Sequence, residues 1–263
     1  LQHEMNGMTG QTIHFRVLGC AGGTGDGRHT TSFLVDDDLL IDAGTGITRL
    51  TLDEMRRIDS VFLTHAHLDH VLGLPLLVDA VAGERAQPLR VFALPEVIDI
   101  LRAHIFNWRI WPDFAVLPDA AQPLLTYTPV SFGESINVGG RELTALPVAH
   151  GEPAAGYRLR GGGGSLIFSG DTTSHAEFWR IVNATADLRH LIVEASFPNR
   201  LRDLADASRH YCPANLLPDL AGLRGDAAVW ITHLKPGQED EIMAELRAAP
   251  RAAALMQEQR IVW

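Results

Sequence analysis

The chain has little that would cross-link it or carry it into a membrane. It contains two cysteines in 263 residues, Cys20 and Cys212, so a disulfide framework is excluded and a single bridge has no support from the sequence. No apolar run approaches the ~20 residues that a membrane-spanning helix requires. Lys and Arg total 22 against 32 Asp and Glu, and the formal net charge is −10. Without a basic block, this balance argues against nonspecific binding to nucleic acid or to an anionic membrane.

The length and the apolar content are those of a protein with a substantial core. Hydrophobic residues make up 46% of the chain, and 263 residues fit one large domain. We predict a single domain over residues 13–263. Residues 1–12 are expected to be an N-terminal tail left by processing or expression, because the chain starts without Met and without a basic and apolar leader. The predicted compartment is the cytoplasm, with the periplasm as the alternative.

One short segment carries most of the chemical information. Thr-His-Ala-His-Leu-Asp-His directly follows the apolar run 60–63. His65 and His67 are two residues apart, so both imidazoles can reach one cation from the end of a strand. Asp69 and His70 follow where a helix should start, and would point to a second cation beside the first. Neutral imidazole and carboxylate are ligands that Zn, Mn and Fe accept, so the segment predicts a metal site.

Three more potential ligands stand far downstream, each at the end of an apolar run. They are His150 after 146–149, Asp171 after 166–170 and His233 after 229–232. A buried strand carries its functional residue where it emerges from the core, so these endings can converge at one edge of a pair of sheets. We predict two metals that share the bridging residue Asp171, the first held by His65, His67 and His150 and the second by Asp69, His70 and His233.

Apolar runs and turn residues predict many short strands with helices between them. Strands are expected at 13–18, 31–36, 39–42, 60–64, 89–93, 124–130, 135–138, 142–149, 156–160, 165–169, 191–195 and 228–232. Helices are expected at 47–57, 71–82, 95–106, 176–184, 213–220 and 239–248.

Two further segments are unusual in composition. The glycine-rich segment 19–27 could be mistaken for a dinucleotide-binding turn, but that turn needs a helix directly after it and here a strand is expected. We interpret it as a mobile loop at the mouth of the site. The aromatic and proline-punctuated segment 107–118 predicts an ordered loop or cap, whose aromatic side chains are either local core or a platform for a ligand.

The order of the six histidine and aspartate ligands around Asp171 resembles that of the metallo-β-lactamase superfamily in its two-metal hydrolase form. The resemblance runs from about Ile13 to the C-terminus. It implies an α/β fold, the metallo-β-lactamase four-layer αββα sandwich, in which two stacked mixed sheets are covered by helices and the metals lie at one edge. This fold carries many chemistries, so other residues have to indicate the reaction.

Four scattered segments are similar to those of class II 3′,5′-cyclic-nucleotide phosphodiesterases. They are 65–73, 104–107 with 110–113, 193–199 and 231–236. The chain departs from that family at 75–77, where Pro-Leu-Leu stands in place of a small hydroxyl residue.

The resemblance implies a phosphodiesterase that converts cAMP or cGMP to the 5′-monophosphate by in-line attack of a metal-bound hydroxide. The expected cofactors are two divalent metal ions, Zn or else Mn or Fe. Asp69 would orient the attacking water or accept its proton. As in related RNA-processing phosphodiesterases, Glu194 would orient His210, which would give a proton to the leaving oxygen. The alternative for this pair is a structural carboxylate and a surface histidine.

Other residues are candidates for contact with the substrate, namely His29, Ser32, Asn107, Trp111 and Lys235. Asp42, at the end of a strand, is either the acceptor that fixes a ligand imidazole or a turn residue. The predicted partner is a small cyclic nucleotide, with no large nucleic acid and no membrane, and a homodimer is a candidate assembly.

Three other functions fit parts of the pattern. A tRNA 3′-end-processing phosphodiesterase shares the metals and the pair of Glu194 and His210, but needs a basic arm that grips RNA. A lactonase-type hydrolase does not need an acid for the leaving group. A metal-dependent binding or sensor protein would keep the site without turnover.

Overall fold

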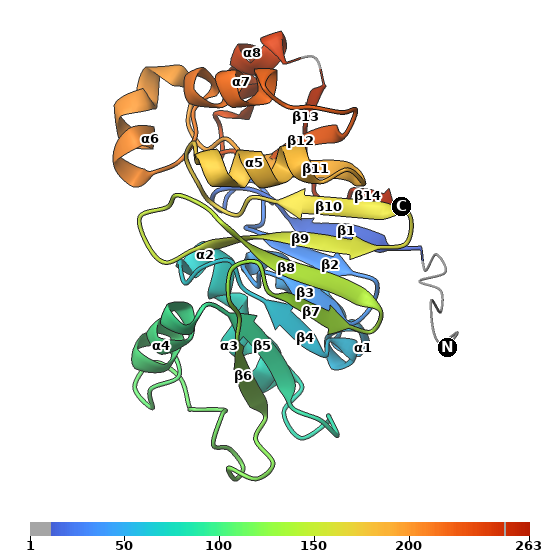
Figure 1. Ribbon diagram of the computed structural model, residues 1–263. Helices are drawn as coiled ribbons and strands as arrows, with labels where there is room; N and C mark the ends of the chain where they lie inside the picture. Colours follow the sequence, from blue (N-terminus) through green and yellow to red (C-terminus); the bar gives the residue numbers. More distant parts are fainter. Residues whose placement is uncertain (1–11, 250) are drawn as a thin grey trace, which may run out of the picture.

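Two stacked sheets form the centre of the molecule, and helices cover their outer faces (Figure 1). The computed structural model describes residues 12–249 and 251–263. Each sheet has seven strands, in the order β14-β1-β2-β3-β4-β5-β6 and β13-β12-β11-β10-β9-β8-β7. The predicted α/β four-layer αββα sandwich is therefore confirmed. Apart from Thr12, the predicted N-terminal tail lies outside the described residues.

The first sheet is mixed. Its strands are β1 (His14–Gly19), β2 (Ser32–Val35), β3 (Leu39–Ile41), β4 (Ser60–Phe62), β5 (Leu89–Ala93), β6 (Leu125–Pro129) and β14 (Arg260–Val262). The strands from β3 to β6 pair in parallel, whereas β14, β1, β2 and β3 pair antiparallel.

The second sheet is mixed in the same way. Its strands are β7 (Ser135–Val138), β8 (Arg141–Pro147), β9 (Ala155–Gly161), β10 (Gly164–Phe168), β11 (Leu188–Glu194), β12 (Ala228–Thr232) and β13 (Ala252–Ala254). The strands from β7 to β10 pair antiparallel, and those from β10 to β13 pair in parallel.

The helices lie on both outer sides of the sheet pair. Figure 1 places α1 (Leu52–Arg57), α3 (Gly73–Ala80) and α4 (Pro95–His104) on the side of the first sheet. It places α5 (Ala176–Ala184), α7 (Pro213–Ala221) and α8 (Glu239–Glu245) on the side of the second. The remaining helices are α2 (Leu68–Val71), α6 (Arg202–Ser208) and the 3₁₀ turns η1 (Thr45–Arg49), η2 (Asn199–Leu201) and η3 (Leu246–Ala248). None of the described helices is long and apolar enough to cross a membrane.

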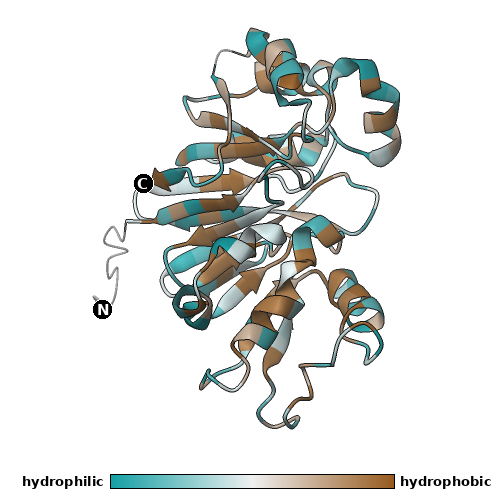
Figure 2. Ribbon diagram, turned by 180° about the vertical axis from the view of Figure 1, so that it is seen from behind, coloured by the Kyte–Doolittle hydropathy of each residue, from teal (hydrophilic) through white to brown (hydrophobic). Residues whose placement is uncertain are grey.

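Aromatic side chains join the two sheets. Phe33 on β2 meets Phe168 on β10 edge to face, with ring centroids 5.0 Å apart. Phe62 on β4 meets Tyr157 on β9 in the same way at 5.6 Å, and the Tyr157 hydroxyl donates to the Leu63 carbonyl. Figure 2 shows the hydrophobic strands in the middle of the molecule. Because such interiors are closely packed, these contacts fix how the strand ends of the two sheets lie against each other.

The single helix predicted over 47–57 is wrong. The chain forms η1, breaks at Thr51 and starts again as α1. The Thr51 hydroxyl accepts from the Glu54 backbone N–H, and the Glu54 carboxylate accepts from the Thr51 backbone N–H. This reciprocal cap stabilises a new helix start inside the apolar pattern.

Other boundaries also differ from the prediction. The helix predicted at 71–82 begins earlier, as α2, and is divided from α3 at Leu72. The helix predicted over 239–248 ends as η3. The pattern missed α6, β13 and β14, because the edge strands are only three residues long and α6 has a mostly polar surface. The remaining predicted strands and helices are present with small shifts at their ends.

A close approach of Gly44 fixes the loop before α2. A Cβ at this glycine would lie 2.1 Å from the Asp69 carbonyl oxygen and 2.8 Å from the Thr31 carbonyl oxygen. We expect Gly44→Ala to lower the free energy of unfolding by about 1–3 kcal/mol, because backbone atoms cannot move aside. Urea unfolding measures this effect. Gly163→Ala is the matched control, since its Cβ would meet nothing within 4 Å. Equal stability of both variants would contradict the close approach.

Candidate functional site

Strand ends from both sheets meet at one edge and carry the predicted ligands. The segment 64–70 leaves β4 of the first sheet and enters α2. His150 follows β8, Asp171 follows β10 and His233 follows β12, all in the second sheet. The structure brings all seven predicted metal-binding residues together as two groups that share Asp171.

The first group consists of His65, His67, His150 and Asp171. His67 Nδ1 lies 3.0 Å from His65 Nε2 and 3.2 Å from His150 Nε2. Asp171 Oδ2 lies 3.6 Å from His65 Nε2. Three imidazole nitrogens and one carboxylate oxygen therefore surround a common point.

The second group consists of Asp69, His70, Asp171 and His233. His233 Nε2 lies 3.1 Å from Asp69 Oδ2 and 3.2 Å from Asp171 Oδ2. His70 Nε2 lies 3.4 Å from the same Asp171 oxygen. One oxygen of Asp171 thus faces imidazoles of both groups.

The second ring nitrogen of the buried imidazoles is held by an oxygen outside the cluster. His65 Nδ1 lies 3.0 Å from Thr64 Oγ1, His150 Nδ1 lies 3.3 Å from the Arg209 carbonyl and His233 Nδ1 lies 2.9 Å from Ser196 Oγ. His70 Nδ1 donates to Asp42 Oδ2 at 2.7 Å. Such bonds fix the tautomer and the direction of a ligating imidazole.

Asp42 is both an acceptor for a cluster imidazole and a turn residue, the two interpretations considered for it. Its carboxylate holds His70 and also accepts from the backbone N–H and the hydroxyl of Thr64. Its backbone has a φ of 57°, the left-handed conformation of a turn residue. The interpretation of Asp42 as the acceptor behind a ligand is therefore confirmed geometrically.

Charge in the cluster is uneven. Burial lowers the pKa of His65 well below its usual range, with repulsion from His70 adding to the effect, and burial also lowers the pKa values of His67 and His150. These three imidazoles are therefore neutral near pH 7. Burial alone would lower the pKa of His70 too, but Asp171 and Asp42 hold it well above the usual range.

The donor set fits a divalent metal ion. His70 Nε2 and Asp171 Oδ1 are buried and have no hydrogen-bond partner among the described residues. Leaving such groups unpaired is costly, so each requires a partner that the protein does not supply. A cation that takes the place of the His70 proton, bound among imidazoles and carboxylates, would provide it.

Glu194 and His210 form a buried pair beside the metal-binding residues. Glu194 Oε1 lies 2.7 Å from His210 Nδ1 and also accepts from the Thr172 backbone N–H. Burial would lower the pKa of His210, but the charge of Glu194 and its hydrogen bond raise it above the usual value. The His210 ring stacks on His233 with centroids 5.3 Å apart. Because His210 is only 7% exposed, its interpretation as a surface histidine is wrong.

Three of the five candidate substrate contacts, His29, Ser32 and Lys235, differ in their exposure and in their hydrogen bonds. Lys235 lies near His210, where its ammonium group donates to the Gly22 carbonyl and stands 5.6 Å from the centre of the Phe197 ring. The hydroxyl of Ser32 is fully buried and donates to the Thr31 carbonyl. His29 is half-buried, and its backbone N–H donates to Gln257. Lys235 therefore lies beside the proposed acid His210, whereas the hydroxyl of Ser32 is buried away from any ligand.

The segment 107–114 is folded on itself. Asn107 donates to the Ala103 carbonyl and accepts from the backbone N–H groups of Arg109 and Ile110. Trp111 packs partly buried against the main core. No contact among the described residues joins Asn107 or Trp111 to the cluster, so their predicted contact with substrate has no support.

The glycine-rich segment packs directly behind His233. The Gly22 backbone N–H donates to the Leu234 carbonyl, and a Cβ at Gly22 would lie 2.4 Å from the His233 carbonyl oxygen. Only glycine allows this approach. The segment is followed by β2, which excludes the dinucleotide-binding turn.

Sequence reasoning missed three residues that position the site. Thr64 and Ser196 follow β4 and β11, and their hydroxyls bond the cluster imidazoles. Arg209 presents its carbonyl to His150 from a left-handed backbone with φ 54°. Hydroxyl residues directly after buried strands were the available signal for the first two. Nothing in the local sequence indicates Arg209.

Comparisons with known proteins agree with this geometry. A family model described as the beta-lactamase superfamily domain matches residues 38–256. A probable 3′,5′-cyclic-nucleotide phosphodiesterase of Yersinia pestis is 30% identical over 86% of this chain and 79% of its own length. A ribonuclease Z of Bradyrhizobium sp. (strain ORS 278) is 32% identical, but the match covers 43% of this chain and 36% of the ribonuclease. The crystal structure of unliganded yeast PDE1 superposes with a TM-score of 0.77 at 19% identity, over 95% of this chain and 99% of that one.

The bond between Asp42 and His70 predicts a large effect on metal binding. Asp42→Asn removes the charge that holds His70 in place, so we expect metal affinity to fall roughly 10- to 100-fold. Competition with a chromophoric chelator measures the affinity. Asp36→Asn is the matched control, because Asp36 also has a left-handed backbone but pairs with Arg141. Unchanged affinity in Asp42→Asn would show that His70 does not depend on this carboxylate.

Proposed function

The chain belongs to the metallo-β-lactamase superfamily, and we propose that it is a metal-dependent phosphodiesterase that hydrolyses 3′,5′-cyclic nucleotides to 5′-monophosphates. The observation that carries the proposal is the placement of the Glu194–His210 pair directly beside two ligand groups that share Asp171. The Yersinia pestis relative, named a probable 3′,5′-cyclic-nucleotide phosphodiesterase, supports the substrate class.

Two metal ions are proposed, and Zn fits the donors best. His65, His67 and His150 would hold one, and Asp69, His70 and His233 the other, with Asp171 shared by both. Imidazole and carboxylate also suit Mn and Fe, which are the alternatives. When bound, a pair of divalent ions neutralises phosphate charge and lowers the pKa of water towards neutrality.

Residues of the chain would supply the proton transfers. Asp69, a half-buried member of the second group, offers a carboxylate that would orient the attacking water or accept its proton. His210 Nδ1 is bonded to Glu194, which leaves Nε2 as the atom that can donate. The 3′ alkoxide of a cyclic nucleotide is a poor leaving group, so its departure needs such a proton.

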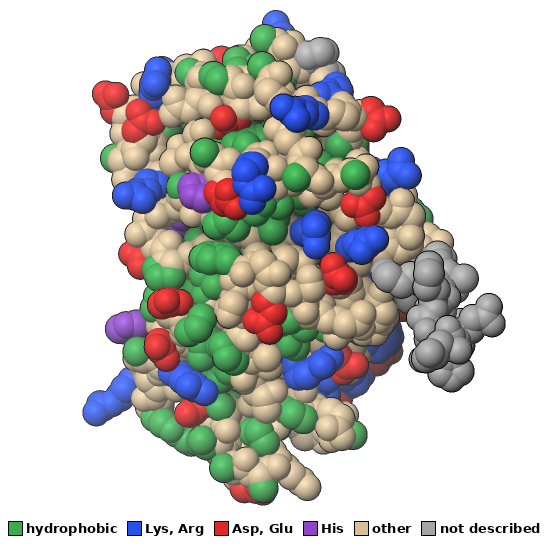
Figure 3. Space-filling model, viewed as in Figure 1, with side chains coloured by type: hydrophobic (Ala, Val, Ile, Leu, Met, Phe, Trp, Pro, Cys, Tyr) green, Lys and Arg blue, Asp and Glu red, His purple; other side chains and the backbone are tan. Residues whose placement is uncertain are grey.

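Features of the chain disfavour the other hydrolases. Figure 3 shows acidic and basic side chains interspersed on the visible face, without a broad basic patch. With a net charge of −10, this does not suit a ribonuclease that grips RNA. Lactone opening does not require the buried pair of Glu194 and His210.

A substrate panel tests the proposal directly. We expect metal-loaded protein to hydrolyse cAMP or cGMP and bis-p-nitrophenyl phosphate, and to leave a lactone panel and pre-tRNA unchanged. Product chromatography should give the 5′-monophosphate, because the 3′ oxygen is the one that receives the proton. Turnover of the lactones alone, or of pre-tRNA alone, would overturn the proposal. Metal-loaded protein that hydrolyses no phosphodiester would favour a binding or sensor protein.

The leaving-group acid has a test of its own. His210→Ala should slow hydrolysis of cyclic nucleotides by roughly 10²-fold or more, yet largely spare bis-p-nitrophenyl phosphate, because p-nitrophenolate leaves without a proton. Glu194→Gln should show the same pattern more weakly. His14→Ala, on the exposed start of β1, is the matched control. Equal losses on both substrates with metals retained would mean that His210 positions phosphate instead.

A further inference from the structure

A cleft of about 620 Å³ opens beside His150. Its walls come from segments far apart in the sequence, namely the start of α4 and the loops after β6 and β8. His175 before α5 and Arg209 after α6 complete the lining. A cleft of this size falls in the usual range for small-molecule sites. Its lining is partly apolar, through Val130, Phe132, Val148 and Pro153.

The cleft is continuous with the cluster. His150 belongs to the first ligand group and also lines the cleft. Its ring lies 5.1 Å from that of His210, centroid to centroid. Arg209, which also lines the cleft, directly precedes His210 and holds His150 Nδ1 with its carbonyl. A ligand whose phosphate lies at the cluster can therefore extend past His150 into this space.

Phe132 offers an exposed aromatic surface in the cleft. Its side chain is 51% exposed, which is unusual for a phenylalanine. The backbone is nevertheless held, because Phe132 forms a β-bridge with Ala145 on β8 and the Gly133 N–H donates to the Ala145 carbonyl. The preceding Val130 N–H donates to the Ala93 carbonyl at the end of β5. Because the backbone that carries this ring is already ordered, stacking on a flat ligand costs little further backbone freedom.

Polar groups around the ring suit the edge of a nucleobase. The cleft is lined by the carboxylates of Glu96 and Glu152 and by the guanidinium of Arg209. Carboxylates accept from the exocyclic amine of a purine, and a guanidinium donates to its N7. The Arg209 side chain is held in place, since its Nη1 donates to the His150 carbonyl. Its left-handed φ of 54° is that of the residue that caps the C-terminal end of α6, and this turn places Arg209 beside His150.

We propose that this cleft is the site of the purine base, with Phe132 stacking on the base and Arg209 positioning its edge. The inference rests on the proposed function for the identity of the ligand. It places the base away from the 107–114 segment, where the exposed aromatic Trp108 has no contact with the cluster among the described residues.

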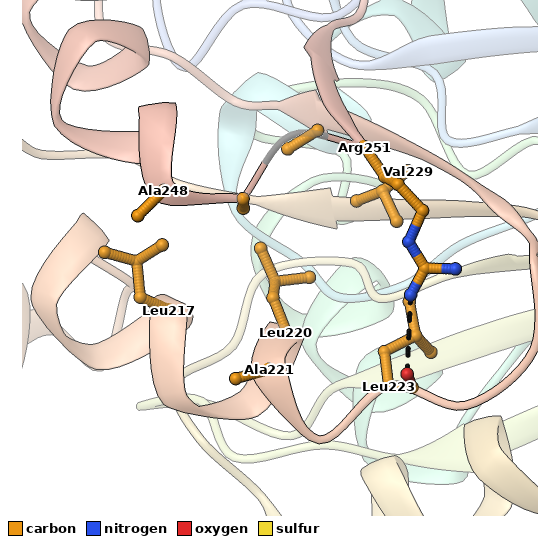
Figure 4. A pocket seen from close by; sticks show the side chains of 9 residues that line it. Leu217, Leu220, Ala221, Leu223, Val229, Ala248 and Arg251 are labelled. Atoms are coloured by element: carbon orange, nitrogen blue, oxygen red, sulfur yellow. Dashed lines mark hydrogen bonds between the residues drawn. The ribbon is translucent and has the colours of Figure 1, made fainter.

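Another cavity has a different character. A space of about 250 Å³ lies between α7, η3, β12 and β13 and is lined mainly by aliphatic side chains (Figure 4). Its Arg251 donates to the Leu223 carbonyl, so this charge is already satisfied within the fold. None of the ligand residues lines it. It therefore offers neither an aromatic face nor a route from the phosphate.

Calorimetric titration of metal-loaded protein tests the base site without turnover. The probes are 5′-AMP and ribose 5-phosphate, which share the phosphate and differ in the base. We expect wild-type protein to bind 5′-AMP more tightly than ribose 5-phosphate. Phe132→Ala should raise the Kd for 5′-AMP roughly tenfold and leave that for ribose 5-phosphate within about twofold. Phe132→Tyr, which keeps the aromatic face, should retain the tight binding.

Trp108→Ala is the matched control, because Trp108 is equally exposed but lies on the other aromatic segment. An unchanged Kd for 5′-AMP in Phe132→Ala, equal weakening of both probes, or the same loss in Trp108→Ala would overturn the base site. Hydrolysis of cAMP by wild-type protein without any preference for 5′-AMP would overturn the base site and leave the proposed function standing. Tight, Phe132-dependent binding of 5′-AMP by a protein that hydrolyses no cyclic nucleotide would support the base site and overturn the proposed substrate.

Discussion

The buried carboxylate of Asp171 is the point on which the rest of the site depends. One of its oxygens faces His65 and His70 from the first sheet and His233 from the second. A negative charge in this position is costly unless positive charge surrounds it. The stacked sheets therefore have to keep their relative position so that these groups stay together. The aromatic contacts between β2 and β10 and between β4 and β9 meet this requirement.

A buried carboxylate bonded to an imidazole occurs twice, and the two imidazoles have different positions relative to Asp171. Asp42 holds His70 and Glu194 holds His210, both at 2.7 Å. The first imidazole turns its other nitrogen towards Asp171 and so belongs to the ligand groups. The second imidazole stacks on His233 beside the cluster, where we propose that it acts as an acid. Under this proposal, the position of an imidazole relative to Asp171 decides whether it is a ligand or an acid.

Polar groups around the cluster connect residues that come from different loops. Ser196 contacts Glu194, His210 and His233 at once, so the acid and one ligand share an anchor. Arg209 connects His150 to the proposed base site in the same way. These hydrogen bonds connect the metal-binding residues, the proposed proton donor and the lining of the cleft. A change in one of them is therefore expected to affect its neighbours.

Local sequence determined much of this protein. Apolar runs that end in His or Asp identified the strands and all seven residues of the two ligand groups, because buried strands deliver polar residues where they leave the core. Asp42 was recognised for the same reason, whereas Glu194 and His210 were predicted from the resemblance to related RNA-processing phosphodiesterases. Helix starts were less predictable, since the cap at Thr51 competes with a continuous apolar pattern.

Only the tertiary structure decided which loops lie around the ligand groups. Phe132, Glu152 and Arg209 come from three distant segments, and no spacing relates them. Conversely, Asn107 and Trp111 stand in a suggestive aromatic segment, but the Asn107 side chain bonds within that segment and Trp111 packs against the core. The position of a ligand at a strand end follows from the burial of that one strand, and the apolar run of the strand shows this burial in the sequence. The walls of a cleft depend on how loops from different strands pack against each other. No local pattern in the sequence shows this packing, because it depends on the complete fold.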